Sequence, residues 1–306
     1  MQLDSTRITV RERSLLDIFD LALHVTREFA AAWVGTSLLG ILPLMLINYA
    51  LIGWMADIDY DQELAPFRFL WNMTLLVIIE APLASIFTVA YLGPAVFMEQ
   101  RKFRQLFSDV FRCAPHLFVC QLILRGILPA WLLLLTVNRF EFTGFVEGFL
   151  LPVIAIYSCG LRAMRPYINE IVLLEKNPLW SRNSQAITIG KRSGLLHGPS
   201  SSDLLVRWIC SAMIGVLLIG IALTTATVAM GILVGEWPIS VSEEGAAMVL
   251  NWLEVQLVYP ACLWFVAAYF SVVRFLSYLD LRIRHEGWEV ELLMRAEALR
   301  LSARMT

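Results

Sequence analysis

The sequence predicts an all-α integral membrane protein with six transmembrane helices. Three observations predict this fold class: the composition is unusually apolar, six long apolar stretches recur along the chain, and basic residues gather in alternate segments between them. Of the 306 residues, 58% are hydrophobic and 16% are charged, with a mean hydropathy of +0.67. Soluble domains carry about 25% charged residues, which coat their surface. A bilayer is the alternative solvent for so much apolar surface, because a spanning helix needs about 20 mostly apolar residues.

Each of the six stretches is long enough to cross the hydrocarbon region as a helix. The first and fifth contain no charged residue, whereas the fourth is the shortest and ends before Arg162 and Arg165. We expect the six spans at residues 30–54, 69–98, 113–138, 144–161, 208–235 and 248–273. Residues 30–274 would then form the transmembrane domain, between an N-terminal segment at 1–29 and a C-terminal tail at 275–306.

The charge pattern predicts the orientation of the chain. All but three of the 24 Lys and Arg residues fall in the N-terminus, in residues 99–112, in residues 162–207 and in the C-terminus. The exceptions are Arg68, Arg125 and Arg139, and the intervening loops are acidic. Because basic loops remain on the cytoplasmic side, we expect both termini to be cytoplasmic. An even number of spans agrees with that expectation.

Amphipathic helices are expected beside the spans on the cytoplasmic side. Ser14 and Asp17 have the spacing of a capping box, and apolar residues recur at helical intervals behind them as far as Phe29. A second amphipathic pattern covers residues 103–111. Such helices lie in the membrane interface or pack against the protein's own bundle, and the sequence leaves both alternatives open.

A short repeated motif predicts an internal repeat. Residues 40–43 in the first span and 126–129 in the third both read Gly-Ile-Leu-Pro, and both follow an amphipathic segment. The even-numbered spans also share a Pro followed by an aromatic residue and a small residue. We therefore expect three units, each a cytoplasmic amphipathic helix followed by a transmembrane hairpin.

Two charged residues are expected deep in the membrane. Glu80 lies in the second span and Arg125 in the third, at similar depths, so they could pair across adjacent antiparallel helices. A lone charge at that depth costs roughly 3 kcal/mol, which pairing or water relieves. The alternatives are an ion or substrate pathway and a structural ion pair.

The stretch after the sixth span is rich in charged and aromatic residues. Arg282 and Arg284 are expected at the cytoplasmic membrane surface, where anionic lipid attracts basic side chains. Gly287 is expected to end one helix, and Trp288 to begin an amphipathic helix that contacts the membrane or a partner. Arg282, Arg284 and Trp288 are candidate contacts with the membrane surface or a partner, not candidate catalytic residues.

No pattern of catalytic or metal-ligating residues is evident in the sequence. The five Cys residues lie in or beside apolar stretches without CxxC spacing, and the four His residues are scattered. We therefore expect no cofactor, no bound metal and no nucleic acid partner.

Two short stretches resemble known membrane proteins. Residues 278–292, which read YLDLRIRHEGWEVEL, are similar to the tail of bacterial multi-pass membrane proteins of unknown function. Residues 168–176 and 180–184 resemble a segment in the membrane domain of some glycerophosphodiester phosphodiesterases and in related stand-alone domains of unknown function. The resemblance implies a multi-pass protein of the bacterial cytoplasmic (inner) membrane. It carries no catalytic residues over, because the phosphodiesterase activity belongs to a separate soluble domain.

These observations favour a non-enzymatic function. The leading expectation is a scaffold or accessory component that acts with protein partners, or with further copies of itself, at the bilayer. The alternative is a small transporter or channel that uses Glu80 and Arg125.

Overall fold

The structure of the chain is a computed structural model. It describes residues 13–56, 65–96, 103–137, 143–180, 187–234 and 253–286. Every regular element in these ranges is helical, and six helices are long and apolar enough to cross a membrane. These six cover Ala30–Ala56, Phe67–Val96, Phe103–Ile123, Val146–Met164, Ser201–Leu233 and Glu254–His285. The prediction of an all-α protein with six apolar helices of spanning length is therefore confirmed.

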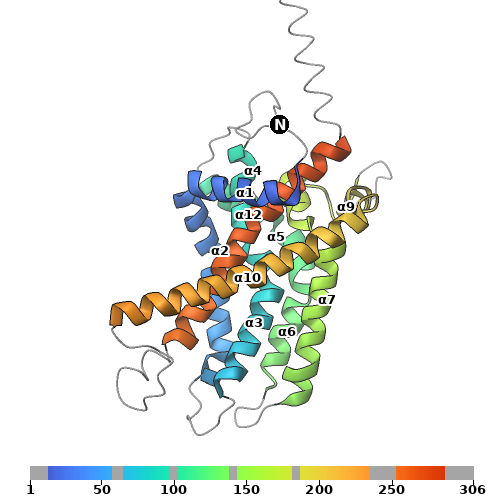
Figure 1. The fold of residues 1–306 in the computed structure, drawn as a ribbon. Coiled ribbons are helices and arrows are strands. Elements are labelled where there is room, and N and C mark those ends of the chain that lie inside the picture. The colour runs from blue at the N-terminus through green and yellow to red at the C-terminus, as the bar shows by residue number, and fades with distance from the viewer. Residues whose placement is uncertain are drawn as a thin grey trace, which may run out of the picture.

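The helices form a bundle that runs between two ends of the molecule (Figure 1). Helix α1 (Leu15–Glu28) lies across one end, which we call the α1 end, and the 3₁₀ turn η1 (Gly53–Ala56) lies at the other, which we call the η1 end. The long helix α10 (Ser201–Val234) slants across the outside of the bundle. It packs against α7 (Leu151–Met164) and α12 (Tyr259–Glu286).

Helix α1 begins at the predicted capping box. The Ser14 hydroxyl accepts a bond from the backbone N–H of Asp17, and the Asp17 carboxylate accepts one from the backbone N–H of Ser14, both at 3.2 Å. These bonds satisfy backbone donors that the first helical turn leaves free. The buried face includes Ile18 and Phe19, and the Phe19 carbonyl accepts a 2.9 Å bond from Tyr269 on α12. Of the two alternatives for this amphipathic helix, packing against the bundle is the one observed.

The second span consists of two helices in line. Helix α2 (Ala30–Ile52) forms the first span, and α3 (Ala65–Ala84) then continues into α4 (Ile86–Val96) with an interruption at Ser85. Pro82 lies inside α3, where it cannot donate a backbone hydrogen bond. The Pro82 carbonyl accepts from the Ser85 hydroxyl at 2.7 Å, so a side chain satisfies a backbone acceptor next to the interruption.

The third span differs from the prediction. The amphipathic segment at 103–111 is not a separate helix, because α5 (Phe103–Leu117) runs on into the π-helical segment η2 (Phe118–Ile123). The chain then breaks, and α6 (Ile127–Leu134) follows. The single predicted span at 113–138 is therefore wrong. Gly126, at the break, adopts the left-handed conformation with φ 81°, which glycine reaches without steric cost.

The two Gly-Ile-Leu-Pro motifs have different conformations. Gly40 lies inside the unbroken helix α2, whereas Gly126 ends a turn between two helices. The motif therefore does not impose one local structure on the two units of the predicted repeat.

The remaining described helices are short segments and the final span. The short segments are η3 (Val146–Leu150), α8 (Ile168–Glu170), η4 (Ile171–Glu175), α9 (Ile189–His197) and η5 (Glu254–Val258). Helix α12 continues to Glu286, well beyond the predicted boundary at residue 273. The predicted tail therefore begins too early, because Phe275 and Tyr278 are fully buried in the bundle.

The buried apolar residues form two clusters. One includes Phe19, Val110, Ile171 and Tyr278 and lies toward the α1 end, while the other includes Met55 and residues near it and lies toward the η1 end. Polar residues that are buried or partly buried also occur within the bundle. We call the following set of them the polar layer: Ser37, Ser85, Thr88, Gln121, Arg125, Ser158, Arg162, Asn169, Glu170, Ser271 and Arg274.

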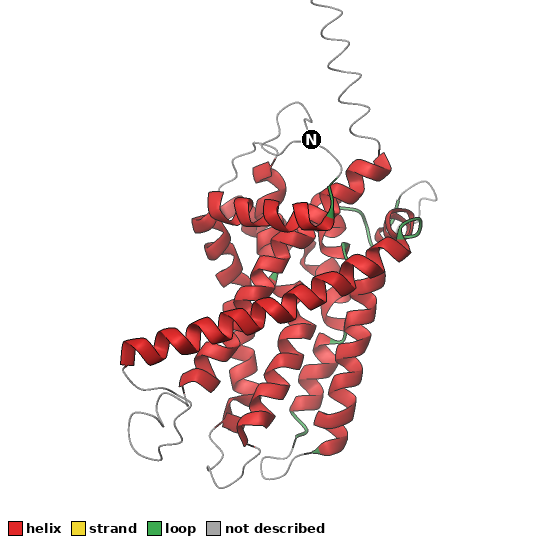
Figure 2. Ribbon diagram, viewed as in Figure 1, coloured by secondary structure: helices red, strands yellow, loops and turns green. Residues whose placement is uncertain are grey.

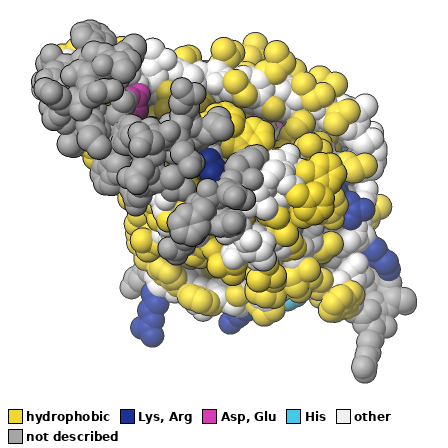
Figure 3. Space-filling view, turned by 90° about the horizontal axis from the view of Figure 1, so that it is seen from below, with side chains coloured by type: hydrophobic (Ala, Val, Ile, Leu, Met, Phe, Trp, Pro, Cys, Tyr) yellow, Lys and Arg dark blue, Asp and Glu magenta, His cyan; other side chains and the backbone are white. Residues whose placement is uncertain are grey.

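The outer surface is largely apolar. Helices make up almost all of the described chain (Figure 2), and hydrophobic side chains dominate the described surface seen from the η1 end (Figure 3). In α10, only 6% of the most apolar stretch is buried against the rest of the chain. Lipid contact accounts for such a surface, since the apolar side chains need no cover of protein.

Candidate functional site

Arg125 lies at the break in the third span, within the polar layer. The turn is held by bonds from Leu124 N to the Val119 carbonyl at 3.1 Å and from Gly126 N to the Ile123 carbonyl at 3.2 Å. A Cβ on Gly126 would approach the Ile154 side chain to 2.8 Å, so the turn requires glycine there. The side chain of Arg125 is 1% exposed.

The guanidinium of Arg125 is poorly partnered. Its Nη2 donates to the Arg165 backbone carbonyl at 3.3 Å, whereas Nε and Nη1 have no hydrogen-bond partner. The charged groups that act on it are two arginines, Arg162 and Arg274, and one carboxylate, Glu170. Arg162 is in a similar state, because its Nε and Nη2 are also buried without a partner.

Glu80 does not pair with Arg125. Its two carboxylate oxygens accept bonds from other side chains, one from Asn48 at 2.9 Å and one from the Trp131 indole at 2.6 Å. These partners lie on α2 and α6, so Glu80 joins three helices among residues of the cluster toward the η1 end. The predicted pairing of Glu80 and Arg125 is therefore wrong: both residues are deeply buried, but each has different partners.

A hydrogen-bonded network occupies the rest of the polar layer. Arg274 Nε donates to Glu170 at 2.9 Å, and its Nη2 donates to the Ser85 hydroxyl at 2.5 Å. The Asn169 amide donates to the Ser85 hydroxyl at 3.3 Å and to the Pro82 carbonyl at 2.6 Å. Gln121 donates to Asn169. This network ties both interrupted spans to α12 and to the short helix α8, next to Arg125.

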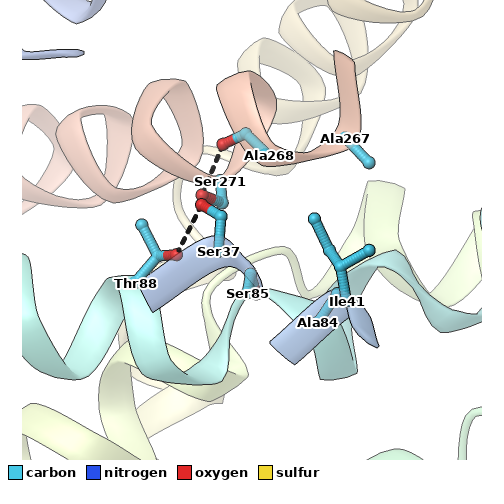
Figure 4. Close-up of a pocket in the computed structure, with 8 residues that line it drawn as sticks. All are labelled: Ser37, Ile41, Ala84, Ser85, Thr88, Ala267, Ala268 and Ser271. Atoms are coloured by element: carbon cyan, nitrogen blue, oxygen red, sulfur yellow. Dashed lines mark hydrogen bonds between the residues drawn. The ribbon is translucent and has the colours of Figure 1, made fainter. Parts of the chain in front are cut away.

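The layer continues on the side of α2 as a narrow gap lined by hydroxyls. Ser37, Ser85, Thr88 and Ser271 line it together with small apolar residues (Figure 4). Ser37 and Thr88 share a 3.3 Å hydrogen bond, and Ser271 donates to the Ala268 carbonyl at 2.6 Å. The gap is too tight to hold a water molecule, so the polar layer is closed on the side of α2.

A second buried arginine, Arg68, is fully paired. Its Nε and Nη2 donate to the two oxygens of Glu147 at 2.8 and 2.7 Å, which is the bidentate arrangement favoured by arginine and carboxylate. Asn72 and the backbone N–H of Thr143 also donate to Glu147, at 2.9 and 3.0 Å. The Arg68 guanidinium lies 5.0 Å from the ring of Trp54. This ion pair was not predicted, because Arg68 was assigned from the sequence to a loop and only Glu80 and Arg125 were considered as a charge pair within the membrane.

The predicted surface contacts near the C-terminus have partners within the chain. Arg284 donates to Asp280 and, at 3.2 Å, to the Arg13 carbonyl, while Arg282 approaches Glu175 to 3.9 Å. Their predicted contacts with lipid or a partner protein remain predictions. Trp288 lies outside the described residues.

His197 is buried near the polar layer, at the end of α9. Its Nδ1 shares a 3.0 Å hydrogen bond with the Ser193 hydroxyl, and its ring packs against Tyr167. Burial lowers the pKa of His197 to about 4, and the positive charges of Arg165 and Arg125 act in the same direction. The imidazole is therefore neutral at physiological pH.

The described residues contain no group of three or more His, Cys, Asp or Glu side chains placed to hold a metal ion. All five cysteines, which lie within that part of the chain, are free. The buried guanidinium nitrogens of Arg125 and Arg162 that lack partners are donors for a ligand, and such groups bind anions.

Comparison with family models, with curated proteins and with solved structures found no match to this chain.

Proposed function

We propose that this chain is a small membrane transporter or channel that admits an anion to the polar layer at Arg125. The supporting observation is the state of that side chain. A buried charge inside a spanning helix costs free energy unless it is paired, and such residues mark ion or substrate pathways. Arg125 is almost completely buried, has two unpartnered nitrogens and lies among two further arginines and one carboxylate.

The broken third span supports the same proposal. Discontinuous helices line the substrate sites of many transporters, because irregular backbone within the membrane is tolerated where it borders a cavity or is buried in protein. Since the layer is closed on the side of α2, an anion that reaches it from that side would enter through another conformation. The break between Ile123 and Ile127, where the helix is interrupted, is a point at which α6 could move relative to α5.

We further propose the orientation and membrane predicted from charge. The side chains of Arg207 and Arg284 pair with Asp280 at the α1 end, where the backbone N–H of Arg13 also donates to Asp280, so basic residues gather where the N-terminal helix lies. By the positive-inside rule this end would face the cytoplasm, in a bacterial inner membrane, with three hairpins and both termini cytoplasmic. Labelling of single-cysteine variants from each side of the membrane tests this orientation.

Anion uptake into proteoliposomes tests the proposed function. Wild-type protein should carry at least one of chloride, succinate and phosphate down a gradient, and Arg125→Met should abolish that flux. The exposed residue Arg104 provides a matched control, since Arg104→Gln also removes one positive charge and should leave the flux unchanged. Equal flux in wild type and Arg125→Met, or none from either, would contradict the proposal.

Glu80→Gln separates a pathway role from a structural one. The structure places Glu80 away from Arg125, so this variant should lower stability and leave the anion preference unchanged.

A second candidate is the accessory role expected from the sequence. Helix α10 is compatible with it, because a second protein could cover its apolar surface in place of lipid, besides the partner contact predicted for the C-terminal tail. Deleting residues 287–306 should then remove a stoichiometric partner that co-purifies with the full chain. A deletion variant that retains every partner of the wild type would count against this candidate.

A further inference from the structure

We infer that the anion bound in the polar layer is a tetrahedral oxyanion of the phosphate type, held jointly by Arg125 and Arg162. This inference rests on the proposed function, because it names the ligand class and the second binding residue of the same site. Arg162 was not among the residues singled out from the sequence. It lies in the last turn of α7, next to the stretch where that helix faces α6.

The cluster carries more positive than negative charge. Arg125, Arg162 and Arg274 are its cations, and Glu170 is the carboxylate that acts on Arg125. Glu170 is already paired with Arg274 at 2.9 Å. Its second oxygen is buried without a partner, and three guanidinium groups against one carboxylate leave an excess of about two positive charges whichever arginine Glu170 contacts. Phosphate esters carry about −1.5 to −2 charges at pH 7, which matches this excess.

The unpartnered donors have the geometry of a binding fork. Two other arginines in this chain use Nε and Nη2 together: Arg68 holds Glu147 with them at 2.8 and 2.7 Å, and Arg192 holds Glu175 at 2.6 and 2.9 Å. In Arg162 the same two nitrogens are buried and have no partner. The free fork is therefore suited to two oxygens of one anion.

The number of donors favours four oxygens over two. Arg125 adds Nε and Nη1 to the two nitrogens of Arg162, so four N–H-bearing atoms, on α7 and on the turn at the break, lack acceptors. A carboxylate has two oxygens, which one guanidinium fork occupies, and a halide has no directional acceptors. A tetrahedral oxyanion can accept from both guanidinium groups at once.

Inorganic phosphate and the phosphate headgroup of a lipid share this chemistry. Arg165, whose carbonyl accepts from Arg125, is exposed, so the site lies close to the surface of the bundle. Either source could therefore approach the cluster, and the experiment must distinguish them.

Equilibrium dialysis of the detergent-solubilised full chain against radiolabelled inorganic phosphate is the first arm of the test. Wild type should bind about one phosphate per chain, with neither chloride nor acetate displacing it at equal concentration. Arg162→Gln should weaken binding about tenfold or more, and Arg162→Lys, which keeps the charge but loses the fork, should weaken it by an intermediate factor. Arg104→Gln should bind as the wild type does.

The second arm measures lipid retention in nanodiscs that contain phosphatidic acid and phosphatidylcholine. If phosphate fails to bind but phosphatidic acid is retained by the wild type and lost from Arg162→Gln, the ligand is a lipid headgroup and the inference stands. Size-exclusion profiles and far-UV circular dichroism establish that each variant is folded. Arg162→Lys provides the comparison if Arg162→Gln does not fold.

Several outcomes would overturn the inference. Binding that is equal in the wild type and both Arg162 variants would show surface association only, and no retention in either arm would show that the cluster takes no phosphate-type ligand. Phosphate binding without anion flux would leave the inference standing and remove the proposed function. Chloride or succinate flux without phosphate binding would overturn the inference and leave the proposed function standing.

Discussion

Replacing Arg125 with Met should stabilise the ligand-free protein, whereas replacing Arg68 with Met should destabilise it. Both side chains are buried arginines in spanning segments, exposed by 1% and 6% respectively, so the two substitutions alter apolar packing to a similar degree. They differ in their partners. Arg68 is bidentate with Glu147, while Arg125 makes one 3.3 Å bond to a backbone carbonyl.

The magnitudes follow from that difference. Removing one partner of a buried ion pair costs about 3–5 kcal/mol, because the other charge stays buried without compensation. Arg68→Met should therefore lower the free energy of unfolding by that amount. Removing Arg125 forfeits one charged hydrogen bond, about 1.5–3 kcal/mol. It also relieves about 2.5–3.5 kcal/mol for an arginine within the membrane. The net expectation is a gain of about 1 kcal/mol.

Unfolding of the purified variants by SDS in mixed micelles, followed by circular dichroism, measures both changes. Arg68→Met combined with Glu147→Leu is the internal control, since removing both charges should recover most of the loss. If Arg125→Met loses as much stability as Arg68→Met, Arg125 is a structural cross-link. The unpartnered nitrogens of Arg125 would then not mark a ligand site.

Two further predictions concern the rest of the bundle. Burial lowers the pKa of His197, so the unfolded chain binds a proton at higher pH than the folded chain does. The free energy of unfolding should therefore be intact above about pH 6.5 and fall by about 3 kcal/mol as the pH drops toward 4. Thermal melts across this range should show the loss in the wild type and in the surface control His24→Gln, but a much smaller loss in His197→Gln. Gly40→Ala would force a Cβ against the backbone carbonyl of Ala84 and should lower the free energy of unfolding by about 1–3 kcal/mol or more. Gly35→Ala in the same helix meets open space and should be neutral or slightly stabilising in the same melts. Equal stability of the two glycine variants would contradict the packing of α2 on α3.

Hydropathy and charge predicted the spanning helices because lipid imposes a strong constraint. Every backbone polar group in the hydrocarbon must be bonded within the protein, so long apolar stretches become helices with few alternatives. The capping box at Ser14 was also predictable, since it depends on residues three apart.

The break in the third span could not be read from local sequence. The same Gly-Ile-Leu-Pro motif is helical at Gly40 and broken at Gly126, so the neighbouring helices decide the outcome. Gly40 packs against the carbonyl of Ala84, and Gly126 turns beside Ile154. Contacts of this kind join residues more than 25 positions apart, which no periodicity records.

The composition of the site was predictable only in part. Arg125 stood out as a charge within an apolar stretch, but its neighbours depend on how each helix is rotated. Arg162 follows the apolar stretch of α7 and was assigned to a basic loop, although it lies only one residue beyond the predicted end of that span. Arg68 likewise lies one residue before the predicted second span, and its pairing with Glu147, near the start of the fourth, was missed. Charged residues within one turn of a span's end are therefore candidates for burial.

The most direct test of the account is to locate an anion in the polar layer. Crystals of the full chain grown with selenate, a tetrahedral oxyanion that scatters anomalously, should show one anomalous peak about 3 Å from the guanidinium nitrogens of both Arg125 and Arg162. Crystals of Arg125→Met grown in the same way should lack that peak. An empty layer in the wild type, with Arg125 closed onto Glu170 and selenate only at the protein surface, would contradict the central claim.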